Sequence, residues 1–306
     1  MISRIVVAFS LVILLAVIFA TPQPAAAQAT IVPNSAVDLV RVTVAKEMAA
    51  ANDNSAKYMF HACKKTPQGS TSRIYVETRE AMAGMTTAYN DKPLTPEQMQ
   101  GEKGRLARLV GNPELLQRKQ RQEKEEAEHT LRIVRALPDA FLYEYDGSEV
   151  GTANTGSEGK KLLRLKFRPN PAYRPPSHVE DVLTGMQGYL LIDAAAHRIA
   201  RIDGTLFKDV TFGWGILGHL NQGGRFMVQQ QDVGDGSWEV SHMSLDFTGK
   251  ILLFKNLAIK SEEVFSGFRR VPAGTTFAEG VRMLQEEESK PAQSGPETAR
   301  AERKSR

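Results

Sequence analysis

The second half of the chain alternates between short apolar runs and turn residues. Beyond Pro138, apolar side chains recur at nearly every second position, and Gly, Asn, Asp and Pro separate the runs. The runs cover residues 141–145, 162–167, 188–193, 198–203, 225–232, 238–247, 250–259 and 264–268. Eight strands in succession, with no helix long enough to cross over between them, predict an antiparallel sheet.

The first half predicts helices and a few further strands. A helix is expected over residues 35–51, a β-hairpin over 58–63 and 73–78, and a short strand over 85–89. With the hairpin added, the sheet has about ten or eleven strands, and a sheet that wide must curl.

Two more helices are expected in the segment 95–137. The sequence from Thr95 to Gln98 has the capping-box pattern with a Pro at the first helical position, and Asn112-Pro113 repeats this start. The second helix is strongly charged over residues 118–129, which is typical of a solvated face.

These elements predict an α+β fold with a strongly curved antiparallel sheet. In residues 161–167, Leu165 and Phe167 point to one face while charged side chains point to the other, so one face is buried and one is wet. The helices over 35–51 and 95–136 are the candidates to cover the concave side.

The first 29 residues have the features of a cleavable secretory signal peptide. Arg4 precedes an apolar run over residues 5–20, and cleavage near Ala27 or Ala29 is expected. A retained membrane anchor is the alternative, but the run is shorter than the roughly 20 residues that span a bilayer. We therefore expect a periplasmic or secreted protein with no stable membrane span after cleavage.

The remaining chain is expected to form a single half-barrel domain over residues 30–284. Residues 285–306 are charged and contain almost no large apolar side chain, which predicts a disordered tail. The net charge of +4, which becomes +3 without Arg4, comes from interspersed Lys and Arg and does not indicate nucleic-acid binding. Because Cys63 is the one cysteine, no intramolecular disulfide is expected.

The sequence predicts neither an enzyme nor a metal or cofactor site. His61 and Cys63 lie on one side of a strand, but a structural metal site needs about four ligands. The six histidines are scattered along the chain. Strand-flanked residues 213–218 are rich in Gly but lack the strand-loop-helix setting of a phosphate-binding loop. They predict either a broad turn whose aromatics fill one end of the barrel or a mobile apolar flap beside a ligand entrance.

Three segments carry a resemblance to a known family: the strand that begins at Tyr58-Met59-Phe60, the segment from Asn90 to Gln98 that leads into a helix, and residues 188–193 followed by 198–204. Through them the chain resembles exported bacterial proteins of the LolA/RseB-type half-barrel superfamily, which includes lipoprotein carriers. The resemblance is remote and covers most of the mature chain in element order. It implies an incomplete barrel with helices against its open side, whose hollow binds acyl chains, lipoproteins or lipid without catalysis.

The leading hypothesis is a periplasmic carrier or binding protein for an apolar ligand, a lipid or a lipoprotein acyl group. It predicts a dry hollow, and large side chains filling that hollow would count against it. The residues expected to line the hollow are Leu165, Phe167, Phe207, Phe212, Trp214 and Phe226. The alternative is a non-enzymatic interaction module, an envelope sensor or scaffold that contacts another envelope protein. An envelope hydrolase ranks last, because no nucleophile or carboxylate pair stands out.

Overall fold

The structure of the protein is a computed structural model that describes residues 35–53, 55–212, 218–251 and 255–290. The expected signal peptide, Trp214 and the part of the expected tail beyond residue 290 lie outside the described residues.

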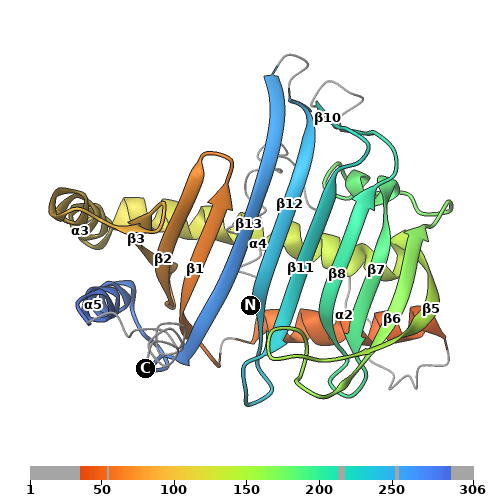
Figure 1. Ribbon diagram of the computed structural model, residues 1–306, viewed down its shortest axis with the longest axis horizontal. Coiled ribbons are helices and arrows are strands. Elements are labelled where there is room, and N and C mark those ends of the chain that lie inside the picture. Colours follow the sequence, from red (N-terminus) through yellow and green to blue (C-terminus); the bar gives the residue numbers. More distant parts are fainter. Residues whose placement is uncertain (1–34, 54, 213–217, 252–254, 291–306) are drawn as a thin grey trace, which may run out of the picture.

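The described chain forms one antiparallel sheet of 13 strands that is open between its edge strands β4 and β5. The strand order is β4-β3-β2-β1-β13-β12-β11-β8-β7-β6-β5, with β10 and β9 attached beside β12. The strands are β1 (Tyr58–Thr66), β2 (Gly69–Glu77), β3 (Met82–Tyr89), β4 (Lys92–Pro93), β5 (Phe141–Val150), β6 (Lys161–Pro169), β7 (Met186–Asp193), β8 (Arg198–Leu206), β9 (Val210–Phe212), β10 (Gly218–Leu220), β11 (Arg225–Asp232), β12 (Trp238–Ile251) and β13 (Lys255–Arg270). The predicted α+β fold with an open, curved antiparallel sheet is confirmed (Figure 1).

The last two long strands differ from the sequence pattern. Strands were expected over 250–259 and 264–268, but residues 250 and 251 end β12, and β13 runs without a break from Lys255 through the second expected strand. The polar residues between the runs stay in register, since Lys260 pairs with Asp246 and Glu263 pairs with Met243. Because β13 is paired on both sides, with β12 and with β1, neighbouring strands hold its backbone through the polar stretch.

Four α-helices and one 3₁₀ turn accompany the sheet within the described residues. They are α2 (Ala36–Asn52), α3 (Pro96–Gly111), α4 (Pro113–Ala140), the 3₁₀ turn η1 (Asp181–Gly185) and α5 (Phe277–Glu288). The capping box at Thr95 and the break at Asn112 are both present. Helix α5 was not expected, and it ends at Glu288, inside the segment predicted to be a disordered tail.

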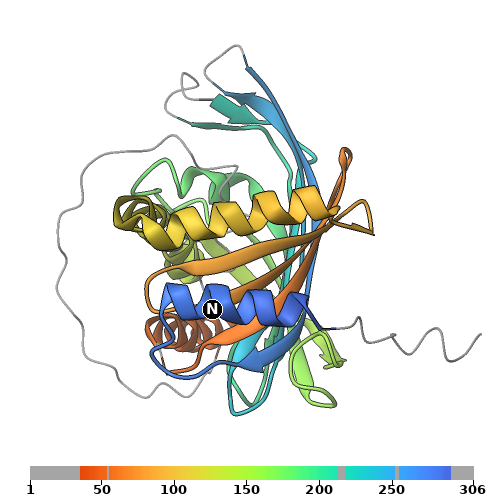
Figure 2. The same cartoon turned by 90° about the vertical axis from the view of Figure 1, so that its left-hand side faces the viewer.

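The helices cover both faces of the curled sheet. Helix α2 and the C-terminal part of α4 pack on the concave side, in the large apolar cluster that contains Leu39, Val40 and Leu137. Helices α3 and α5 pack instead on the other face of β1–β3, where Leu106 and Val281 belong to a second cluster. In Figure 2, α3 and α5 lie outside the curled end of the sheet while α2 lies within the curl. The expectation that the whole segment 95–136 covers the concave side is thus wrong for α3, because β1–β3 carry apolar side chains on both faces.

The exposed edge of β3 is covered by charged side chains of α3 and α4. Glu102 Oε1 accepts a hydrogen bond from the Thr86 backbone N–H at 2.7 Å, and Glu123 Oε2 accepts one from Met82 at 2.9 Å. Arg105 donates to the Gly84 carbonyl at 2.6 Å. An unpaired strand edge would otherwise be open to pairing with another chain. Part of the charged run 118–129 therefore has a structural role instead of forming only a solvated face.

A buried ion pair fixes α2 to the sheet. Glu47 lies opposite Arg198 at the start of β8, with both nitrogen–oxygen distances at 3.0 Å, and it also accepts the Ile199 backbone N–H at 2.8 Å. The two side chains are only 5% and 8% exposed. The Arg198 guanidinium also lies over the Trp238 ring, 5.6 Å from its centre. The Glu47 carboxylate thus accepts three hydrogen bonds.

We expect Glu47→Ala to lower the free energy of unfolding by about 3 kcal/mol, because it leaves a buried guanidinium without its carboxylate. Urea denaturation followed by circular dichroism measures this. Lys46→Ala, at an exposed neighbouring position on α2, serves as the control and should stay within about 0.5 kcal/mol of the wild type. Similar losses in the two variants would show that the ion pair does not anchor the helix.

Candidate functional site: the inner wall of the curved sheet

The central strands present a largely apolar surface on their concave side. We call this surface the inner wall. Ala62 of β1 pairs with Phe265 of β13, and Leu245 of β12 pairs with Phe226 of β11, so these side chains share one face across four strands. The inner wall consists of Phe60, Ala62, Phe226, Met243, Leu245 and Phe265, all of them buried.

Aromatic rings give the inner wall its shape near β1. Phe60 stacks on Tyr75 with ring centres 5.3 Å apart, and it contacts Phe265 and Phe268 at 6.1 and 5.7 Å. Such contacts hold each ring in one orientation. The wall is therefore a preformed apolar surface.

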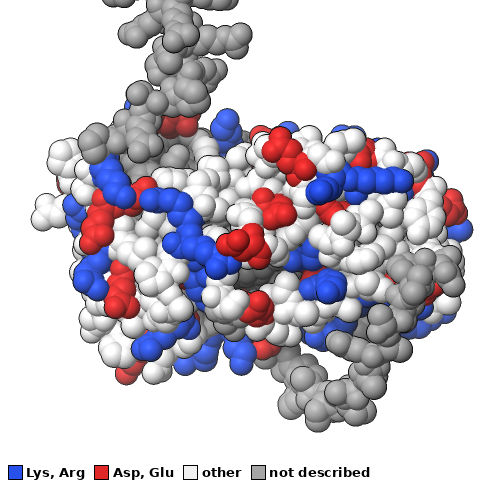
Figure 3. All heavy atoms as spheres, turned by 90° about the horizontal axis from the view of Figure 1, so that it is seen from below, with Lys and Arg blue, Asp and Glu red and all other residues white. Residues whose placement is uncertain are grey.

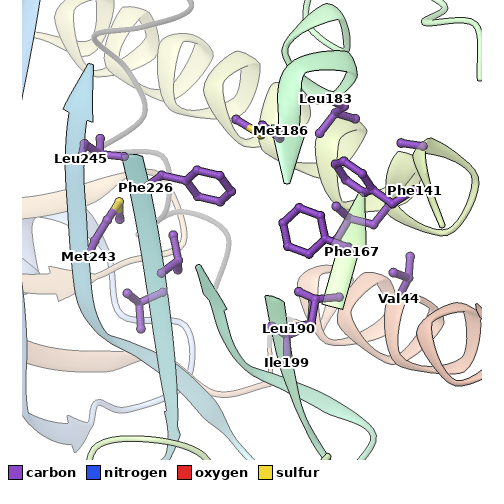
Figure 4. Packing of buried hydrophobic residues seen from close by; sticks show 14 of the residues in the cluster. Val44, Phe141, Phe167, Leu183, Met186, Leu190, Ile199, Phe226, Met243 and Leu245 are labelled. Atoms are coloured by element: carbon purple, nitrogen blue, oxygen red, sulfur yellow. The ribbon is translucent and has the colours of Figure 1, made fainter. Parts of the chain in front are cut away.

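The residues predicted to line the hollow have different environments. Leu165 and Phe167 lie in the large cluster beneath α2, where Phe167 packs against Phe141 at 4.7 Å between ring centres. Phe226 belongs to the same cluster, and its ring points from β11 toward Met186 (Figure 4). Phe207 is 38% exposed and is not part of the cluster. The side chain of Phe212 and all of Trp214 lie outside the described residues.

The part of the cluster beneath α2 is filled by side chains. Val44 of α2, Leu183 of η1 and Phe141 of β5 converge on Phe167 (Figure 4). This half of the concave side is therefore a packed core.

Helix α4 crosses the concave side behind the sheet (Figure 1). Leu116 near its start belongs to the second apolar cluster, and Ile133 to Ala140 contribute to the first. Among the described residues of α4, none between Leu116 and Ile133 joins either cluster. The helix thus spans the open side of the curl with polar side chains while its two ends provide the apolar contacts.

The lower end of the molecule is hollowed near the centre of the view in Figure 3. Side chains of Lys, Arg, Asp and Glu lie around the hollow.

A small polar group interrupts the inner wall. Glu263 of β13 lies between Phe265 and Ser261 on the concave face, opposite Met243, and it is only 3% exposed. Lys64 of β1 pairs with it, with Nζ 3.7 Å from Glu263 Oε2. Burial raises the pKa of the Glu263 carboxyl, and the nearby positive charges of Lys64 and Arg73 offset this only in part.

Arg73 completes the polar group from β2. It pairs with Ala62, so it shares the concave face, and its guanidinium donates to the Tyr75 hydroxyl at 3.3 Å. Within the described part of the chain, Arg73 forms no ion pair with a carboxylate. We call Lys64, Arg73 and Glu263 the wall triad.

The wall triad was not singled out from the sequence, although a signal for it exists. Lys64 has the same parity as Phe60 and Ala62 in a strand whose apolar positions are evident. Its meeting with Glu263 depends on the pairing of β1 with β13, which are about 200 residues apart and whose register no local pattern fixes.

The described residues offer little for other kinds of site. They contain no group of three or more His, Cys, Asp and Glu side chains placed to hold a metal ion. Within the same residues, no helix combines the length and the apolar composition of a membrane span. His61 and Cys63 face away from the concave side, and His61 lies 3.9 Å from Glu287 of α5.

We expect Glu263→Gln to stabilise the protein at neutral pH. A carboxyl whose pKa is raised by folding favours the folded state fully below its ordinary pKa of 4.5, and this contribution is lost as the pH rises through the folded-state pKa. Gln removes the cost of ionising a buried group. The measurement is thermal unfolding at pH values from about 4 to about 8. The gain in Tm should shrink toward acidic pH. A pH-independent gain would show that Glu263 does not titrate in this way.

No family model and no curated protein matches the chain. A comparison with solved structures finds a putative outer membrane lipoprotein-sorting protein domain from Vibrio parahaemolyticus, at 9% identity and a TM-score of 0.27, covering 76% of this chain and 91% of that one. It also finds a DUF1329 family protein from Desulfovibrio piger, at 8% identity and a TM-score of 0.23, covering 76% of this chain and 93% of that one. At these TM-scores, neither likeness carries an argument about function.

Proposed function

We propose that the protein binds an apolar, lipid-like molecule between the inner wall and helix α4, as a carrier or binding protein of the cell envelope. The observation that carries the proposal is the mismatch between these two surfaces. The wall is apolar and aromatic, whereas the described span of α4 between Leu116 and Ile133 gives it no apolar partner. Apolar surface facing polar side chains is unfavourable unless something apolar lies between them.

The preformed wall suits a non-catalytic binding role. Its rings contact one another, so little side-chain freedom is lost when a ligand arrives. The expected secretory signal would place such a protein outside the cytoplasm, where a lipid needs a carrier to cross water. The residues proposed to contact the ligand are Phe226 and the other members of the inner wall.

The first experiment asks whether a lipid is bound at all. Protein purified from its own envelope is extracted with organic solvent, and the extract is analysed by mass spectrometry. Delipidated protein is then titrated with a fluorescent long-chain fatty acid. We expect lipid in the extract and saturable binding of the probe. An empty extract together with no binding would remove the proposal and favour the interaction module.

A matched pair of variants tests the location. Ala62→Phe places a ring on the inner wall, where it should occupy ligand space and weaken probe binding at least tenfold, an effect of about 1.4 kcal/mol, with little change in Tm. Ala83→Phe is the control: Ala83 is fully buried on the opposite face of the sheet, in the cluster beneath α3 and α5. There the added ring should cost about 1–3 kcal/mol of stability by overpacking.

The two outcomes separate a binding surface from a packed core. If Ala62→Phe destabilises the protein as much as Ala83→Phe does, the wall has no room for a ligand.

A further inference from the structure

The inner wall is not uniformly apolar, because the wall triad places three charged side chains close together on it. Lys64 and Glu263 form a cross-strand pair, and Arg73 lies two residue pairs along the ladder, opposite Ala62. Above and below them the concave face returns to apolar side chains, with Ile259 and Phe247 on one side and Phe60 and Phe265 on the other. Binding pockets commonly combine an apolar lining with a few polar groups that orient the ligand.

The wall triad carries excess positive charge. Lys64 has the carboxylate of Glu263 as its partner at 3.7 Å, whereas Arg73 donates a hydrogen bond to the neutral hydroxyl of Tyr75 and forms no ion pair within 4 Å among the described residues. The guanidinium is a planar donor that binds a carboxylate or phosphate through two parallel hydrogen bonds. Tyr75 is buried and stacked on Phe60, so it holds the Arg73 side chain beside the apolar surface.

Both cations are accessible, unlike the wall around them. The Lys64 side chain is 37% exposed and Arg73 is exposed, whereas Ala62, Met243 and Phe265 beside them are buried. An anion can therefore reach the two cations while a chain attached to it lies along the wall.

Resting on the proposed function, we infer that the wall triad is a headgroup site and that the ligand is an anionic amphiphile. Arg73 and Lys64 bind its carboxylate or phosphate, and the inner wall holds its apolar chain. Glu263 lies beside Lys64 and limits the affinity by competing with the ligand for that cation.

The test compares probes that share one apolar chain. A fluorescent long-chain fatty acid, its methyl ester and the corresponding alkyl phosphate are titrated into delipidated protein. We expect the two anions to bind at least tenfold more tightly than the neutral ester. The relative affinity of the fatty acid and the phosphate identifies which anion the site prefers.

Substitutions then assign the preference to the wall triad. Arg73→Gln combined with Lys64→Gln should abolish the anion preference and leave ester binding unchanged. Glu263→Gln should strengthen anion binding several-fold, again with no effect on the ester. Lys65→Gln is the matched control, because Lys65 neighbours Lys64 on the same strand but points to the opposite face and is exposed.

The results separate the two proposals. Equal affinity of the wild type for acid and ester, or an equal loss from Lys65→Gln, would overturn the headgroup site and leave the apolar binding role standing. Absence of binding by every probe would overturn both.

Discussion

The pairing of β1 with β13 is the constraint on which the concave side depends. It joins residues near the start of the folded chain to residues near its end, from Tyr58 with Arg270 to Lys65 with Glu262. Because β13 also pairs with β12, this contact makes a single sheet of two parts that are otherwise separate antiparallel meanders. Without it, Ala62 and Phe265 would not be neighbours and the inner wall would be divided. Closing so long a loop is entropically costly, and the twelve-residue helix α5 together with β1–β3 buries apolar surface that offsets the cost.

Much of the sheet could be predicted because half-buried antiparallel strands alternate in polarity, as Leu163, Leu165 and Phe167 do. The elements that escaped prediction have physical reasons. Strands β9 and β10 have three residues each, too few to show a period. Helix α5 does carry a capping box, from Thr276 to Glu279, and apolar residues at Phe277, Val281 and Leu284. Its C-terminal turn is as rich in charged residues as the segment that follows. Composition alone therefore does not distinguish the end of the helix from that segment.

The candidate site was harder to predict than the fold, for a reason visible in particular residues. Leu165 and Phe167 were expected to line the hollow because they are apolar and alternate, but the same properties suit a packed core, and α2 covers them. Only the position of the helices separates core from lining. The position of helix α4 is fixed by two polar contacts. Glu123 accepts a hydrogen bond from the edge of β3, and Arg132 forms a 3.0 Å ion pair with Glu180 near η1. Because Glu123 and Arg132 both lie within the middle of α4, these polar contacts fix that part of the helix in place, and it acts as a fixed boundary more than as a lid.

The burial of Glu263 shows how stability and binding can oppose each other within this boundary. A neutral residue of the same size would cost less to bury, because the raised pKa of Glu263 means that its ionised form is disfavoured there. Paired with Lys64, however, the carboxylate holds one cation on the concave face, while Arg73 forms no ion pair within 4 Å among the described residues. Buried ionic groups give orientation more readily than they give stability. On the proposed function, an apolar wall alone would accept a chain in either direction, whereas a charged group at one height allows only the direction that brings an anion to Arg73.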